Sequence, residues 1–134
     1  MRTWLKRAAA KFHAWKKRPE KSLRSATVKI NGSGEIHIPL MLHPKLIQAA
    51  RKHKVLIKRT GSTRRETRIY SRSNGTELEI RFFEGESPRE HRTFEYDNSG
   101  RLTRAMVTII DRTLTTYIFF RKGNTIVLDH VEKL

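Results

Sequence analysis

The sequence predicts an α+β fold: a curved antiparallel β-meander of five to seven strands, one packed helix and a basic amphipathic N-terminal helix. Three observations support this prediction. Apolar and polar residues alternate along most of the chain after residue 25, as in strands with one buried face. Glycine-containing turn sequences separate these segments at 73–75, 97–100 and 122–124. The segments 3–18 and 43–53 have helical spacing of apolar residues instead.

Residues 1–25 are expected to form a basic helix followed by a linker. Both tryptophans, Trp4 and Trp15, recur with Phe12 at spacings that place them on one helical face, and Pro19 marks the end of the helix. This helix has three open interpretations: docking on nucleic acid or a partner, covering the sheet core, or contacting a membrane surface or directing targeting.

Residues 26–134 are expected to form a single domain. The segments 26–31 and 35–40 predict a hairpin around Gly32-Ser33-Gly34, and 43–53 predicts a short helix with Pro44 in its first turn. A strand follows at 55–60 and a polar loop at 61–66. The remaining strands are predicted at 67–72, 76–83, 91–96, 101–110, 113–120 and 125–129. We expect the helix at 43–53 or the N-terminal helix to cover the apolar face of the sheet.

The basic charge is concentrated in the first part of the chain. The protein carries a net charge of +16, yet residues 76–134 hold nine basic and ten acidic residues. We therefore interpret residues 26–75 as a basic contact region and residues 76–134 as a neutral β-meander scaffold. A polyanionic partner is the simplest reason for such one-sided charge.

A dense basic run between 51 and 72 is the strongest candidate binding feature. We expect Arg64 and Arg65 on the loop 61–66, where glycine and hydroxyl residues permit close approach to phosphate oxygens. With the basic residues of the first helix, the candidate phosphate contacts are Lys6, Arg7, Lys16, Lys17, Arg18, Arg51, Lys52, Lys54, Lys58, Arg59, Arg64, Arg65, Arg68 and Arg72.

Two short stretches resemble known families. Residues 96–103, Tyr96-Asp97-Asn98-Ser99-Gly100-Arg101-Leu102-Thr103, look like the core of a YD repeat, which implies a twisted antiparallel hairpin with a tight polar turn. Residues 28–39 are similar to the strand–glycine–strand–proline opening of AbrB-type swapped-hairpin DNA-binding proteins. That resemblance implies a dimerising, DNA-contacting unit over 26–60.

These observations favour a non-enzymatic nucleic-acid-binding protein, with RNA slightly preferred over DNA, in a nucleoprotein assembly or as a small regulator. One alternative is a metal-independent ribonuclease toxin using His91, Arg92 and Tyr96. Another is an interaction protein, viral for example, that grips an acidic protein surface. No cofactor or metal is expected, because cysteine is absent and the six histidines are scattered. We expect an intracellular, cytoplasmic location, with an organelle or a virion left open, and the oligomeric state is not predicted.

Overall fold

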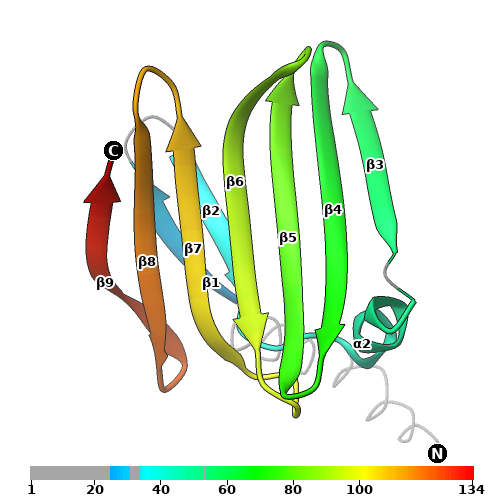
Figure 1. Ribbon diagram of the computed structural model, residues 1–134. Coiled ribbons are helices and arrows are strands. Elements are labelled where there is room, and N and C mark those ends of the chain that lie inside the picture. Colours follow the sequence, from blue (N-terminus) through cyan, green and yellow to red (C-terminus); the bar gives the residue numbers. More distant parts are fainter. Residues whose placement is uncertain (1–24, 31–33, 53) are drawn as a thin grey trace, which may run out of the picture.

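The computed structural model describes residues 25–30, 34–52 and 54–134. Most of these residues belong to a seven-stranded antiparallel sheet in which each strand pairs with its neighbour in sequence, and a separate two-stranded hairpin precedes it (Figure 1). One short helix connects the two sheets. The elements are β1 (Ser25–Ile30), β2 (Gly34–Pro39), α2 (Pro44–Ala50), β3 (Val55–Thr60), β4 (Thr63–Arg72), β5 (Gly75–Glu84), β6 (Ser87–Tyr96), β7 (Leu102–Ile110), β8 (Leu114–Lys122) and β9 (Thr125–Lys133).

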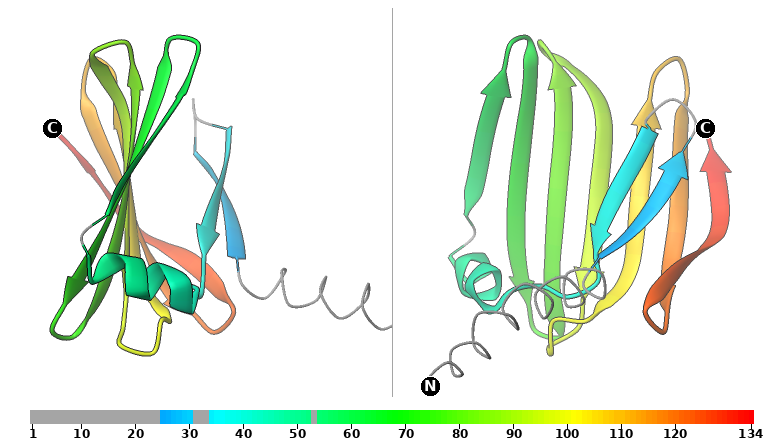
Figure 2. Two further views of the ribbon diagram at one scale, coloured as in Figure 1. Left: turned by 90° about the vertical axis from the view of Figure 1, so that its right-hand side faces the viewer. Right: turned by 180° about the vertical axis from the view of Figure 1, so that it is seen from behind.

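The predicted antiparallel meander and the hairpin at its N-terminal side are confirmed. The basic helix expected over 3–18 lies outside the described residues. Of the two helices expected to cover the apolar face, the N-terminal one lies outside the described residues, and α2 covers only the lower end of that face, where Ala50 and Ile47 reach the core. The β1–β2 hairpin covers much of the rest (Figure 2). The face of the sheet that carries the hairpin and α2 is called the inner face below, and the opposite one the outer face.

A continuous row of apolar side chains crosses the inner face. The strand register aligns Ile69 with Leu78, Leu78 with Phe94, Phe94 with Ala105 and Ala105 with Phe119. All five are buried. Because successive side chains of a strand point to opposite faces, a single register fixes which residues of every strand face inward.

The hairpin supplies the other half of the core. Ile36 and Ile38 of β2 are fully buried, as is Leu40 just beyond it, whereas His37 between them is exposed. This alternation is the pattern of a strand with one buried face. The hairpin therefore packs its apolar side against the inner face of the larger sheet, and the two sheets share one core.

The segment between β2 and α2 is bonded directly to the larger sheet. Leu42 N–H donates to Gly100 O at 2.8 Å, and Leu102 N–H donates to Leu40 O at 2.9 Å. Gly100 has a φ of 86°, and a Cβ on it would lie 3.2 Å from the Leu42 carbonyl oxygen. Glycine is thus required at this position both for its backbone conformation and for the close approach of the crossing segment.

The turn that contains Gly100 has the tight polar geometry implied by the YD-repeat resemblance. The Asp97 carboxylate accepts hydrogen bonds from Ser99 Oγ at 2.7 Å, Ser99 N at 2.9 Å and Arg101 N at 3.0 Å. These bonds, that from the Ser99 hydroxyl first, hold the pKa of Asp97 below its ordinary value.

The shared core predicts a large stability loss when β2 is truncated on its buried side. Ile38→Ala should lower the free energy of unfolding by roughly 2–5 kcal/mol, because it removes buried apolar surface and leaves a cavity. His37→Ala, the neighbouring exposed position, is the matched control and should change it by less than about 0.5 kcal/mol. Urea denaturation measures both values, and equal losses for the two variants would contradict the packing described here.

Candidate nucleic-acid interface

Local sequence features determine where the helix α2 begins and leave its basic side chains on the exposed side. Pro44 occupies the first turn, and the His43 ring accepts a hydrogen bond from Lys45 N at 3.1 Å. Ala50 is fully buried and Ile47 packs against the core. Because these two positions face inward, the polar positions of the helix and of the chain after it remain exposed.

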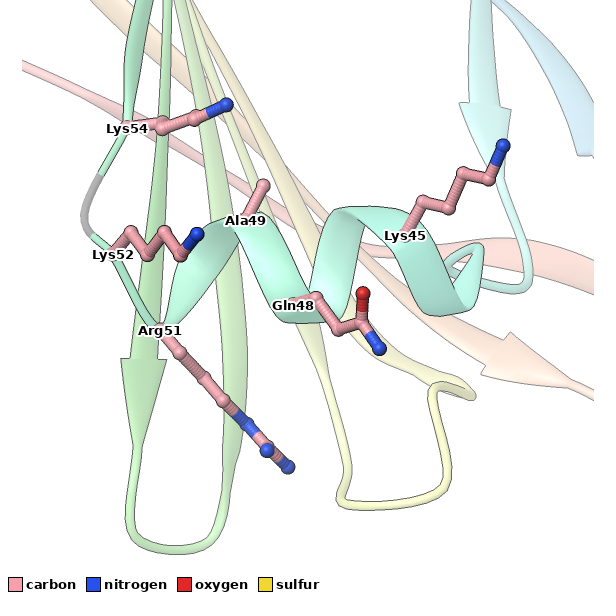
Figure 3. A pocket seen from close by; sticks show the side chains of 6 residues that line it. All are labelled: Lys45, Gln48, Ala49, Arg51, Lys52 and Lys54. Carbon is pink, nitrogen blue, oxygen red and sulfur yellow. The ribbon is translucent and has the colours of Figure 1, made fainter.

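A basic hollow of about 460 Å³ lies at the end of α2 (Figure 3). In Figure 3 the side chains of Lys45, Lys52 and Lys54 extend to the same side of the helix as Ala49, and Arg51 extends the other way. The six lining residues, called the basic hollow from here on, are Lys45, Gln48, Ala49, Arg51, Lys52 and Lys54. No acidic residue of the described part of the chain lines it.

The cations of the basic hollow have no ion-pair partner among the described residues. All four are solvent-exposed, and none is within 4.0 Å of a described carboxylate. Uncompensated positive charges gathered at one place create a local potential that attracts anions. This is the electrostatic property that a phosphate-binding surface needs.

Two further cations extend this surface along the inner side of the first hairpin of the meander. Lys58 of β3 stands opposite Arg65 of β4 in the register, and both are exposed. Strand alternation places Arg65 on the same face as the buried Ile69, which is the inner face. The adjacent Arg59 and Arg64 consequently belong to the outer face.

The expectation of a polar loop at 61–66 is wrong. The strand β4 already begins at Thr63, which leaves a turn of only Gly61 and Ser62, with Gly61 in the left-handed region at a φ of 60°. Arg64 and Arg65 therefore point to opposite faces of the sheet, so the two side chains cannot bind the same phosphate group. The structure brings Arg65 to the basic surface but not Arg64, whose guanidinium carbon lies 4.1 Å from the Phe83 ring centroid.

Three candidate arginines on the outer face take part in ion pairs instead. Arg64 and Arg68 lie 3.6 Å and 3.4 Å from the Glu66 carboxylate, and Arg72 donates to Glu77 at 3.0 Å. Hydrogen bonding to Tyr70, together with Glu66, raises the pKa of Arg68 further above its ordinary value. Because carboxylates already balance these arginines, the outer face is a weaker anion-binding surface than the basic hollow.

The sequence candidates thus fall into three groups. The basic surface on the inner side contains Lys52, Lys54, Lys58 and Arg65, and Arg51 lines the basic hollow from the opposite side of α2. The outer face holds Arg59, Arg64, Arg68 and Arg72. The candidates Lys6, Arg7, Lys16, Lys17 and Arg18 lie outside the described residues. Lys45 and Gln48 are not among the sequence candidates, although Lys45 follows Pro44 at the start of the helix and its outward position follows from the inward Ile47 and Ala50.

The residues of the ribonuclease alternative are not brought together. His91 lies on the outer face, where its Nε2 is 3.4 Å from Glu79 Oε2, whereas Arg92 lies on the inner face and pairs with Glu90. Tyr96 is buried, and its hydroxyl donates to Pro39 O at 2.9 Å. The strand predicted at 91–96 begins earlier, at Ser87, and the alternation of side chains along β6 separates the three residues.

The described part of the chain contains no candidate metal site and no candidate membrane-spanning helix. No group of three or more His, Asp or Glu side chains there is placed to hold a metal ion. None of its helices is long and apolar enough to span a membrane. Comparison of the chain with protein-family models, curated proteins and solved structures found no match.

The buried Tyr96 hydroxyl predicts a specific response to alkaline pH. Burial raises the pKa of Tyr96 above its ordinary value of about 10. Above that pH the unfolded chain loses this proton while the folded protein retains it, so the free energy of unfolding should fall as pH rises.

Tyr96→Phe removes the hydroxyl that makes the free energy of unfolding fall at high pH, and it also removes the hydrogen bond to the Pro39 carbonyl oxygen. We expect the variant to be less stable than the wild type by about 1–3 kcal/mol at neutral pH, with a gap that narrows above about pH 10. Urea denaturation from pH 7 to 11 measures the two curves. Parallel curves over this range would contradict the assigned role of the buried hydroxyl.

Proposed function

We propose that the protein binds nucleic acid without catalysis and holds phosphate groups at the basic hollow. The observation that carries the proposal is the gathering of Lys45, Arg51, Lys52 and Lys54 around one hollow without a described acidic partner. Lysine ammonium groups bind phosphate as point charges, and an arginine guanidinium can bind it with two hydrogen bonds. The Gln48 amide adds a neutral donor to the same lining.

The shape of the surface favours an extended polyanion over a small phosphate compound. The basic hollow is continued by Lys58 of β3 and Arg65 of β4, which form a cross-strand pair. Several phosphates spaced along a backbone can use such a row at once, whereas a single phosphate uses one part of it. Because the proposal rests on phosphate contacts, we expect binding to depend steeply on salt and little on sequence.

The proposal predicts that two lysines of the hollow contribute more than two equally charged residues elsewhere. Lys52→Gln/Lys54→Gln should weaken binding by at least about tenfold and reduce the slope of log K against log salt by about 2 on duplex DNA. The matched control is Arg112→Gln/Lys122→Gln, which removes the same charge from two exposed positions, one in the turn before β8 and one at the end of β8. The control should keep nearly all of the affinity.

The measurement is fluorescence anisotropy with labelled single-stranded RNA, duplex RNA and duplex DNA over a salt series. The order of the three affinities identifies the preferred polymer. Equal losses in both double variants would show that net charge, not the hollow, drives binding. Failure of the wild type to bind any of the three near physiological salt would overturn the proposal and would favour an acidic protein surface as the partner.

A further inference from the structure

The two edges of the seven-stranded sheet are exposed strands with apolar side chains. Each of the edge strands, β3 and β9, pairs on one side only within the described structure (Figure 1). In β3 the consecutive residues Val55, Leu56 and Ile57 are 47%, 54% and 57% exposed. Because neighbouring residues of a strand point to opposite faces, this edge is apolar on both sides.

The edge strand β9 has the same character at the other end of the sheet. Val127, Leu128 and Val131 are 47%, 50% and 40% exposed. An edge strand presents unpaired backbone N–H and C=O groups, and exposed apolar side chains beside them make it a template for pairing with another strand. Both edges therefore have the chemistry of an interaction surface.

The charges of the two edges are opposite. The strand β3 carries Lys58 and Arg59 and no acidic residue. The strand β9 carries Asp129 and Glu132, with one basic residue, Lys133, at its end. The Asp129 and Glu132 side chains are each more than half exposed, and both contact the His130 ring, which together with Lys133 offsets part of their negative charge.

These charges discriminate between the ways in which two copies could pair. An antiparallel pair of β3 strands would bring together two edges that each carry Lys58 and Arg59 and no acidic residue, so positive charges would accumulate along that contact. Pairing of β3 with β9 brings opposite charges together and buries apolar side chains from both edges. The charge pattern therefore favours an unlike pair of edges.

We propose that the acidic edge β9 of one copy of this chain pairs with the basic edge β3 of a second copy. Such a contact uses different surfaces on the two copies, so it can repeat and join copies head to tail into a continuous sheet. Only one short strand pair forms each contact, and this interface is smaller than that of a stable dimer. We therefore expect association in the micromolar range and a strong dependence on protein concentration.

This association does not depend on the function proposed above, although Lys58 lies on β3 and also belongs to the basic surface. Strand pairing uses backbone groups at the edge, whereas the basic hollow is formed by side chains of α2 and the chain after it. The test therefore uses protein treated with nuclease and freed of nucleic acid, so that bridging by a shared polyanion cannot mimic the contact.

The experiment blocks each edge separately. Leu56→Asp/Ile57→Asp blocks β3 and Val127→Asp/Leu128→Asp blocks β9, because aspartate removes the apolar contact and has low strand propensity. Met41→Asp/Leu46→Asp changes two other exposed apolar residues in the same way and is the control. Near-UV circular dichroism verifies the fold. Where a double variant loses its native signal, Ile57→Asp or Val127→Asp alone replaces it.

Sedimentation velocity over a concentration series gives the result. The wild type and the control should associate as concentration rises, more weakly at high salt, and each edge-blocked variant should remain monomeric. When the two blocked variants are mixed, each retains one intact edge, so a one-to-one dimer should form and grow no further. A monomeric wild type into the high micromolar range would overturn the proposal, as would a mixture that stays monomeric while the wild type associates.

Discussion

The rest of the structure depends on how the segment after β2 is held against the larger sheet. Two backbone hydrogen bonds join Leu40 and Leu42 to the turn before β7, and the Tyr96 hydroxyl binds Pro39 O from the adjacent strand. The Arg121 guanidinium also approaches Leu40 O at 3.4 Å. These contacts fix where the hairpin lies on the inner face and where α2 begins. The core and the basic hollow are therefore positioned by one short crossing segment.

The alternation of side chains along the strands divides the basic residues of the chain into two chemical groups. On the outer face, arginines of β4 lie beside glutamates of β4 and β5, and their charges are locally balanced. On the inner side, the cations at the end of α2 and in the first hairpin of the meander have no such partners in the described structure. A single basic run in the sequence thus becomes one balanced surface and one unbalanced surface.

The sequence was informative where local patterns decide the structure and misleading where packing decides it. Turn residues and alternation located the meander, because each of its strands pairs with the next one along the chain. The stretch around Arg64 looked like a loop because it is strongly polar, yet a two-residue turn suffices, and Arg64 lies beside Glu66 of its own strand and Phe83 of the next strand. That β1 and β2 cover the core could not be predicted, since alternation shows that a strand has an apolar side but not what meets it.

The order of the elements also bears on how the chain folds. All pairings within the larger sheet are between sequence neighbours, so the sheet can grow by successive local steps with little loop-closure cost. The packing of the β1–β2 hairpin against this sheet, by contrast, joins residues that lie far apart in the sequence. During synthesis from the N-terminus, β2 emerges with its isoleucines before the strands that bury them exist, and the burying row is complete only when β8 with Phe119 has been made. The earliest strands of the domain therefore reach their final environment late, and the apolar side of the hairpin is the surface that a nascent chain exposes longest.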